Sequence, residues 1–334
     1  MRAGILATVG HTPLIPLERL HTPPRLRVYA KLEGFNPCGS IKDRTALNLI
    51  ESAIAAGQIR PGTTVIESSS GNLGIALAQV CRFLGLPFIC VVDPKITTQN
   101  LRLLMTYGAQ VERVENPDPV TGEYLPARIQ RVHALREAIP NSYWPDQYSN
   151  LNNPAAQRQT MQEIVEALGD PPDAVLCTTG SCGTLRGCAG YVRDSGCKTE
   201  IIAVDAVGSV IFGLPPGKRL IPGHGAAVRP ALYSADLATR CVHVTDLECV
   251  RGCRRLLHSE ALLAGGSSGA LVTALERIRN ELPSGTRCVL VLPDRGDRYL
   301  DTIFNDDWIE KTFGAAALAQ IAALTASRET PCNA

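Results

Sequence analysis

VYAKLEGFNPCGSIKDRTALNLIESAIAAG, residues 28–57, is the stretch that decides the fold. Residues 28–32 are expected to form a β-strand, and Ser40-Ile41-Lys42-Asp43 opens a helix with Ser40 as the expected N-cap. Apolar residues then recur at helical spacing until Gly57 ends the helix. A strand followed by an amphipathic helix is the unit from which parallel sheets covered by helices are built.

The same alternation continues along the chain. Strands are expected at 63–67, 88–92 and 110–114, helices at 72–84, 97–107 and 123–139, and buried strands of a second group at 174–177, 201–204 and 288–292. Since no long linker separates the two groups, we expect two interwoven α/β domains, each with a mainly parallel sheet. The chain is expected to cross between them near 142–154. Residues 207–230, rich in Gly and Pro, predict a long loop, and loops of this length are often active-site lids.

Composition excludes several classes of function. The 334 residues carry 33 Lys and Arg against 32 Asp and Glu, so no overall field attracts nucleic acid or an anionic membrane. No apolar run reaches the 18 residues that a membrane span needs. The twelve cysteines are too dilute for a disulfide framework. We therefore expect a cytoplasmic protein with a small-molecule site.

One group of residues has metal-ligand chemistry. Cys241, His243, Cys249 and Cys253 could be read as a zinc site. Cysteine is more often a small core residue, and the alternative interpretation is a strand followed by a helix. No metal is expected.

Lys42 is the strongest catalytic candidate. An ammonium in the first turn of a helix lies at the positive end of the helix dipole, which disfavours its charge. The lysine pKa should therefore fall toward the neutral amine that a Schiff base requires. A solvated surface lysine is the alternative, and is commoner for lysines in general.

Two polar loops lie between an expected strand and an expected helix. Ser68-Ser69-Ser70-Gly71-Asn72 could bind a carboxylate or phosphate through hydroxyls and backbone N–H groups, or could simply cap the helix. The stretch 178–184, TTGSCGT, has glycines that let the backbone approach a phosphate. It lacks the lysine of a P-loop and the GxGxxG spacing of dinucleotide binders.

A third glycine-rich stretch suggests a rival class of enzyme. Gly265-Gly266-Ser267-Ser268-Gly269 matches the GxSxG pattern of α/β-hydrolases. That fold places its histidine after the serine, whereas all six histidines of this chain precede Ser267. The hydrolase interpretation therefore fails.

Taken together in this order, the four motifs resemble the cysteine synthase/cystathionine β-synthase family of pyridoxal-phosphate enzymes, of fold-type II. The resemblance extends from Gly10-His11-Thr12-Pro13-Leu14 to about Asp301. It implies pyridoxal 5'-phosphate as cofactor. By this resemblance Lys42 would form the Schiff base, Asn72 would hydrogen-bond the ring oxygen and Ser267 would face the pyridine nitrogen. The cofactor phosphate would be held by Thr179, Gly180, Ser181, Cys182, Gly183 and Thr184.

The resemblance also implies how the chain is divided. A large cofactor-binding domain would comprise residues 1–37 and 143–334, and a small mobile domain, residues 38–142, would close over the substrate. The protein would be a homodimer that acts on amino acids, with neither nucleic acid nor membrane as a partner.

Departures from cysteine synthase bear on the substrates. Leu73 and Ser181-Cys182 stand where the family usually has Thr and Thr-Gly. With residues 292–301, LPDRGDRYLD, they look like the siderophore-pathway branch that contains the N-(2-amino-2-carboxyethyl)-L-glutamate synthases. That branch joins O-phospho-L-serine to L-glutamate through an α-aminoacrylate, releasing phosphate and giving a precursor of 2,3-diaminopropionate.

The substrate residues follow from the same resemblance. The α-carboxylate would be bound by Ser69, Ser70, Gly71 and Gln147. A phosphorylated donor needs a cation, and a guanidinium binds phosphate with two hydrogen bonds. Arg128 is the candidate, assisted by the hydroxyl groups of Tyr148 and Ser181; an exposed helix arginine is the alternative.

Two other functions remain open at this point. A cysteine synthase that uses O-acetylserine or O-phosphoserine would share every cofactor residue named above. A non-catalytic regulatory or partner-binding member of the fold is the alternative from a different class. Such a member would not need Lys42, Asn72, the 178–184 loop and Ser267 together.

Overall fold

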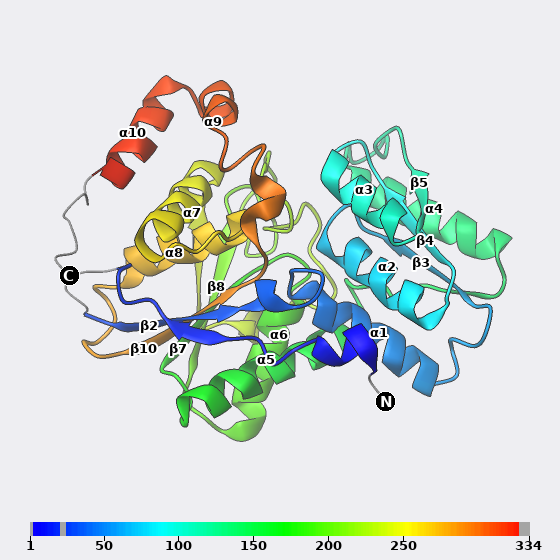
Figure 1. The fold of residues 1–334 in the computed structure, drawn as a ribbon, viewed down its shortest axis with the longest axis horizontal. Coiled ribbons are helices and arrows are strands. Elements are labelled where there is room, and N and C mark those ends of the chain that lie inside the picture. Colours follow the sequence, from blue (N-terminus) through cyan, green and yellow to red (C-terminus); the bar gives the residue numbers. More distant parts are fainter. Residues whose placement is uncertain (1–2, 21–24, 327–334) are drawn as a thin grey trace.

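The computed structural model describes residues 3–20 and 25–326, which form two sheets flanked by helices (Figure 1). The larger sheet has the strand order β1-β2-β10-β7-β8-β9, and the smaller has the order β5-β4-β3-β6. Among the strands described, β1 and β2 pair antiparallel and every other pair is parallel. The predicted α/β fold with two mainly parallel sheets is confirmed.

The larger sheet combines the first strands with those of the second half of the chain. Its strands are β1 Leu14–Pro16, β2 Arg27–Leu32, β7 Ala174–Thr178, β8 Glu200–Ala206, β9 Arg240–Val244 and β10 Arg287–Leu292. Its helices are α5 Asn152–Leu168, α6 Gly183–Ser195, α7 Asp246–Glu260 and α8 Gly266–Ile278, followed by α9 Asp306–Phe313 and α10 Ala315–Ala326. Apolar residues from both faces of this sheet are buried, as expected when helices cover both faces.

The smaller sheet is built from the segment between β2 and β7. Its strands are β3 Thr64–Ser68, β4 Phe88–Val92, β5 Gln110–Arg113 and β6 Ser142–Tyr143, and its helices are α1 Lys42–Ala55, α2 Asn72–Leu84, α3 Thr98–Thr106 and α4 Tyr124–Ala138. Helix α2 has the predicted bounds because Gly85 ends it in the left-handed conformation, at φ 68°.

The chain therefore crosses from one sheet to the other and back. β6 pairs in parallel with β3 in the smaller sheet, and α5 then begins nine residues after Tyr143, on the larger sheet. Since β6 comprises residues 142 and 143, the predicted domain boundary falls inside this short strand. Movement of the smaller unit stays a prediction.

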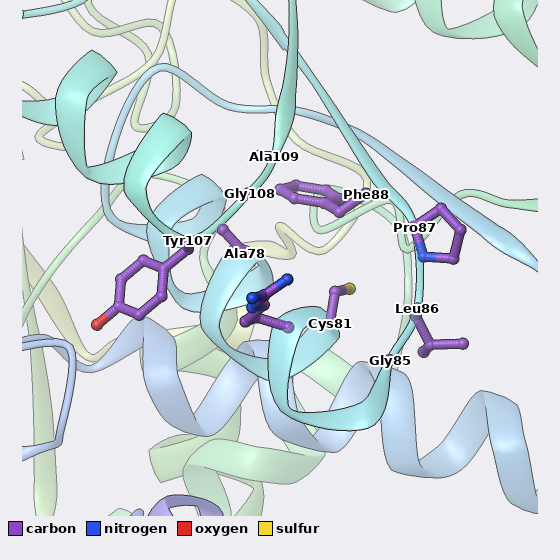
Figure 2. Close-up of a pocket in the computed structure, with 10 residues that line it drawn as sticks. Ala78, Cys81, Gly85, Leu86, Pro87, Phe88, Tyr107, Gly108 and Ala109 are labelled. Carbon is purple, nitrogen blue, oxygen red and sulfur yellow. The ribbon is translucent and has the colours of Figure 1, made fainter.

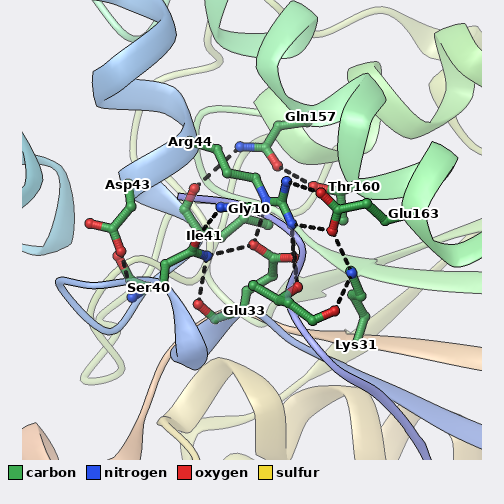
Figure 3. Close-up of polar contacts among 12 residues, drawn as sticks. Gly10, Lys31, Glu33, Ser40, Ile41, Asp43, Arg44, Gln157, Thr160 and Glu163 are labelled. Atoms are coloured by element: carbon green, nitrogen blue, oxygen red, sulfur yellow. Dashed lines mark hydrogen bonds and ion pairs between the residues drawn. The ribbon is translucent and has the colours of Figure 1, made fainter. Parts of the chain in front are cut away.

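A buried ion-pair cluster, consisting of Lys31, Glu33, Arg44 and Glu163, fixes α1 against β2 and α5 (Figure 3). Arg44 Nε lies 2.7 Å from Glu33 Oε2, and Lys31 Nζ lies 2.6 Å from Glu163 Oε2. The cluster has two positive and two negative side chains, so its net charge is zero. Buried charges are tolerated when they are paired in this way.

The structure also bears on the membrane, metal and disulfide interpretations considered from the sequence. No helix within the described residues is long and apolar enough to cross a membrane. In the same part of the chain, no group of three or more His, Cys, Asp and Glu side chains is arranged to hold a metal ion. Cys249 and Cys253 are buried in the core of the larger sheet, and Cys241 Sγ lies 3.9 Å from His243 Nε2. The eleven cysteines that the structure describes are all free.

Candidate active site

Lys42 is the first residue of α1. The turn before it is held by hydrogen bonds within the turn and by one to the segment after β10. Ser40 Oγ accepts a hydrogen bond from Lys42 N at 3.2 Å, and Asp43 Oδ2 accepts one from Ser40 N at 3.1 Å. Ile41 N donates to Pro293 O at 2.8 Å. The N-cap expected at Ser40 is wrong by one residue: the helix begins at Lys42, so its N-cap is Ile41, and Ser40 and Asp43 hydrogen-bond within the turn before it.

The side chain of Lys42 is partly buried. Among the described residues, none hydrogen-bonds or ion-pairs with Lys42 Nζ. Burial lowers the pKa of Lys42 to about 8, while Cys182 acts weakly in the opposite direction. The pKa shift has the direction that the sequence predicted, and burial is its main cause. Lys42 therefore has the unprotonated fraction that a nucleophilic amine needs.

The glycine-rich stretch 178–184 forms a loop from β7 into α6. Thr179 fixes its start, because Thr179 N donates to Val204 O at 3.0 Å and its Oγ1 donates to Asp205 Oδ1 at 2.6 Å. The first N–H groups of a helix have no acceptor within the helix, and the positive end of the dipole lies there. All six residues predicted to bind the phosphate, residues 179–184, thus lie at or just before the start of α6, where backbone N–H groups can receive an anion.

Close backbone approach explains two glycines of this loop. A Cβ atom on Gly180 would lie 2.8 Å from Gly223 O, and one on Gly183 would lie 2.2 Å from Asn153 Oδ1. Cys182 has a φ of 64°, in the left-handed region that favours glycine. The backbone at Cys182 thus adopts a left-handed conformation that glycine favours.

Asn153 was not selected from the sequence. From the first turn of α5, its Nδ2 donates to Ser181 Oγ at 3.1 Å and to Gln147 O at 2.7 Å. Its Oδ1 accepts from Thr45 Oγ1 at 3.2 Å. The Asn153 amide therefore contacts three segments: the 178–184 loop, Gln147 before α5, and helix α1. The sequence offered only an Asn-Asn-Pro helix start, which predicts a boundary and not these contacts.

The serine loop before α2 has the capping role considered for it, and its binding of a carboxylate or phosphate stays a prediction. Ser69 Oγ accepts from Gly74 N at 3.0 Å and from Gly71 N at 3.4 Å, so Ser69 caps the helix. Ser70 Oγ instead accepts from Arg128 Nη1 at 3.0 Å. The loop therefore links the start of α2 to a guanidinium from α4.

Arg128 is not an exposed helix arginine. Its side chain is 11% exposed, and its Nε lies 3.2 Å from Asp93 Oδ2. With Nη1 donating to Ser70, its Nη2 remains without a partner among the described residues. Arg128 and Tyr148 are close enough to interact electrostatically, since burial raises the pKa of Tyr148 and the charge of Arg128 lowers it.

The long loop 207–230 contributes residues that sequence reasoning missed. His224 is 2% exposed, and neither ring nitrogen has a partner among the described residues. Burial lowers the pKa of His224 to about 4; the charge of Asp205 raises this pKa, and the charge of Arg219 lowers it. Gly225 N donates to Thr179 O at 2.7 Å, so this loop lies directly against the phosphate loop.

The serine pair at the start of α8 occupies two different environments. Ser268 is fully buried, and its Oγ has no partner within the described residues. Ser267 is also buried but keeps 6% exposure. Ser267 is therefore the less enclosed of the two, and its role toward a ligand stays a prediction.

Asn72, the first residue of α2, is bound to the segment after β10. Its Nδ2 donates to Asp294 Oδ2 at 2.8 Å, and its Oδ1 accepts from Arg298 Nη1. The sequence predicts no contact between residues 292–301 and Asn72. This contact is a finding of the structure.

Two hollows lie outside this site, and neither is lined by a residue predicted to bind the cofactor or the substrate. A cleft of about 380 Å³ lies between α4, which carries Arg128, and Val228 of the long loop. A second pocket of about 260 Å³ lies at the other end of α2, where Cys81, Phe88 and Tyr107 are among its lining residues (Figure 2). The second pocket shares no residue with the candidate site.

Comparisons with known proteins agree with this geometry. The family model described as pyridoxal-phosphate dependent enzyme matches residues 5–294. An N-(2-amino-2-carboxyethyl)-L-glutamate synthase from Ralstonia nicotianae is 44% identical over 329 residues, which are 98% of this chain and 97% of that protein. The solved structure of O-ureido-L-serine synthase superposes with a TM-score of 0.84 at 30% identity, covering 96% of this chain and 99% of that one. Cysteine synthase from Entamoeba histolytica superposes with a TM-score of 0.85 at 28% identity, covering 97% and 96%.

Proposed function

Because this chain belongs to the pyridoxal-phosphate dependent enzyme family, we propose that it joins O-phospho-L-serine and L-glutamate into N-(2-amino-2-carboxyethyl)-L-glutamate and phosphate. The chain is a transferase that uses pyridoxal phosphate as its cofactor. The identity of the two substrates, O-phospho-L-serine and L-glutamate, is the part that we propose. The observation that carries it is the 44% identity, over nearly the whole length, to a synthase named for that product.

The residues present fit the cofactor. The start of α6 offers an anion site with a close glycine cradle at Gly180 and Gly183. Lys42 has an amine without a partner in the described chain, and its pKa is lowered to about 8. Asn72 Nδ2 carries two hydrogens and has one acceptor, so one N–H remains for the ring oxygen. We assign Lys42, Asn72 and residues 179–184 to cofactor binding, and Ser267 to the ring nitrogen.

When bound, the cofactor acts as an electron sink for bond changes at Cα and Cβ of the amino acid. Lys42 would take the Cα proton, because its lowered pKa lets the amine accept and return a proton near neutral pH. The Cβ–O bond then breaks and the phosphate leaves with its electron pair. The glutamate nitrogen forms the new bond to Cβ and loses a proton.

The substrate carboxylate would meet the serine loop. Backbone N–H groups at the start of α2, with Gln147 and the hydroxyl of Ser70, would bind it. Arg128 would bind the donor phosphate through its unpartnered Nη2, and its interaction with Asp93 keeps the guanidinium in place. Tyr148 and Ser181 would provide hydroxyl donors beside it.

The product name of the relative supports β-replacement on a serine derivative. A 2-amino-2-carboxyethyl group has the carbon skeleton of serine without the hydroxyl, and the glutamate nitrogen occupies the position of the leaving group. Such a product would be a precursor of 2,3-diaminopropionate in siderophore biosynthesis. The second candidate is a cysteine synthase, which the structural similarity to the Entamoeba histolytica enzyme favours.

Mass spectrometry separates the two functions. Purified holoenzyme would receive O-phosphoserine with glutamate, aspartate or sulfide in parallel, and O-acetylserine with the same acceptors. We expect the glutamate adduct and free phosphate from the first mixture. Faster formation of cysteine from sulfide would overturn the proposed acceptor, and a preference for O-acetylserine would overturn the proposed donor.

The remaining parts of the proposal concern assembly and location. We expect a homodimer in the cytoplasm, with neither nucleic acid nor a membrane as a partner. Light scattering of the purified enzyme and fractionation of cells test these expectations. A monomeric active enzyme would contradict the first, and recovery with the membrane fraction would contradict the second.

A further inference from the structure

Asp294, which follows β10, contacts three of the four segments that carry the proposed cofactor residues. Its backbone pairs with Ser40, two residues before Lys42, in an isolated antiparallel bridge. Its carbonyl oxygen accepts from Gly265 N, at the start of α8, at 3.1 Å. Its Oδ2 accepts from Asn72 Nδ2 at 2.8 Å. A single residue of the larger sheet's loop therefore connects the lysine turn, the start of α2 and the start of α8.

Arg298 binds the other end of the same asparagine amide. Its Nη1 donates to Asn72 Oδ1, and its Nη2 donates to the carbonyl oxygen of Cys38. Tyr299 donates from its hydroxyl to Asp294 Oδ2 at 2.6 Å. Arg298 and Tyr299 belong to the short 3-10 turn Gly296–Tyr299, so this turn carries one partner of the amide and binds the other, Asp294, through Tyr299.

These contacts determine which way the amide points. An asparagine side chain has one oxygen acceptor and a nitrogen with two hydrogens. Arg298 occupies the oxygen of Asn72, and Asp294 occupies one hydrogen of its nitrogen. A flipped amide would place oxygen against the Asp294 carboxylate and nitrogen against the Arg298 guanidinium, and both contacts would be repulsive. The unpaired N–H of Asn72 therefore has one defined direction.

We propose that Asp294 and Arg298 are positioning residues that hold Asn72 so that its remaining N–H meets the ring oxygen of pyridoxal phosphate. The same two residues couple this contact to the turn before Lys42, through Ser40 and Cys38. The inference rests on the proposed function only through the role of Asn72 toward the cofactor. It does not depend on which amino acids are the substrates.

The test uses the holoenzyme without substrates. We would purify Asp294→Ala and Arg298→Lys proteins, and measure the ratio of the visible to the near-ultraviolet absorbance band of the bound cofactor and the cofactor dissociation constant. Arg295→Lys is the matched control, since the Arg295 side chain is 62% exposed and ion-pairs with Asp297 on the same loop. We expect both test variants to change the band ratio and to weaken cofactor binding about 10-fold, the effect of losing one charged hydrogen bond. The control should match the wild type.

A double-mutant cycle shows whether Arg298 acts through Asn72. If it does, Asn72→Ala combined with Arg298→Lys should bind the cofactor no more weakly than Asn72→Ala alone. Fully additive losses would overturn the proposal, as would variants that melt earlier but keep the wild-type spectrum and cofactor affinity. If Asp294→Ala does not fold, Arg298→Lys decides. Failure of the wild type to form the glutamate adduct would disprove the proposed function and leave this spectral test unaffected.

Discussion

Arg44 of α1 and Glu163 of α5 form a two-point ion pair in the protein interior: Nη1 donates to Oε1 at 2.7 Å and Nη2 donates to Oε2 at 2.6 Å (Figure 3). Arg44 lies two residues after Lys42 on the same helix. The position of the proposed catalytic amine relative to the larger sheet therefore depends on this pair, and the first predictions concern its removal.

Glu163→Gln should strongly destabilise the fold. The substitution leaves Lys31 and Arg44 with only Glu33 as a buried counter-charge. Breaking a buried pair by removing one partner costs about 3–5 kcal/mol. Urea denaturation of the two proteins measures the loss. The control is Glu166→Gln on the exposed face of the same helix, where less than about 0.5 kcal/mol is expected. Equal effects of the two substitutions would contradict the role given to the pair.

The Glu163 carboxylate should also make the stability of the protein depend on pH in acid. Burial raises the pKa of Glu163, but the hydrogen bonds and charges of Arg44 and Lys31 outweigh burial and lower it from 4.5 to about 2. A lowered carboxyl pKa contributes stability that is complete above the unfolded-state pKa and is lost as the pH falls toward the folded-state value. Between pH 5 and about 2 the wild type should therefore lose more stability than Glu163→Gln. Parallel stability curves would disprove this assignment.

Cofactor capture should depend on pH through Lys42. Burial lowers the pKa of this amine to about 8, so about half of the side chains are neutral at pH 8. The rate at which the cofactor-free protein takes up pyridoxal phosphate should rise through about pH 8 and then level off. Stopped-flow absorbance follows the uptake. A midpoint near pH 10 would show that the amine is solvated, and Lys42→Ala should abolish the visible band.

Arg128→Ala should weaken use of the donor while cofactor binding is retained. A charged hydrogen bond contributes about 1.5–3 kcal/mol, so kcat/KM for O-phosphoserine should fall about 10- to 100-fold. The matched control is Arg131→Ala, one turn further along α4, whose side chain is 45% exposed and ion-pairs with Glu112. Parallel loss of cofactor affinity and donor use in Arg128→Ala would reject a role in binding the donor phosphate.

The serine pair of α8 gives a comparison within one turn of helix. Ser267→Ala should change the absorbance spectrum of the bound cofactor, because it removes the hydroxyl assigned to the ring nitrogen. Ser268→Ala should leave the spectrum unchanged, since its hydroxyl is enclosed and without a partner in the described chain. The opposite result would move the assignment by one residue.

Local signals were enough to predict much of the fold. β4 has its predicted bounds because an uninterrupted apolar run forms the whole strand, and α2 has its predicted bounds because Gly85 supplies the left-handed cap. The loops at 68–72 and 178–184 were also placed correctly at helix starts, where their small and polar residues are favoured.

Contacts between distant segments could not be read from the sequence in this way. Asn153 reaches Ser181 across 28 residues, and Asp294 reaches Asn72 across 222. Neither residue has a local signature, because each is an ordinary polar residue at the end of a helix or strand. His224 is similar: its loop was predicted, but its burial depends on packing against the phosphate loop.

The pairing of β2 with β10 also constrains how the chain folds during synthesis. Arg27 of β2 lies opposite Arg287 of β10. β2 therefore cannot pair with β10 until residues near the end of the chain have been synthesised. The smaller sheet is complete once residue 143 has been made. Until β10 emerges, β2 and β7 both have an open edge, and such edges favour aggregation. A chain that ends before residue 287 would therefore keep one unpaired edge on β2 and one on β7.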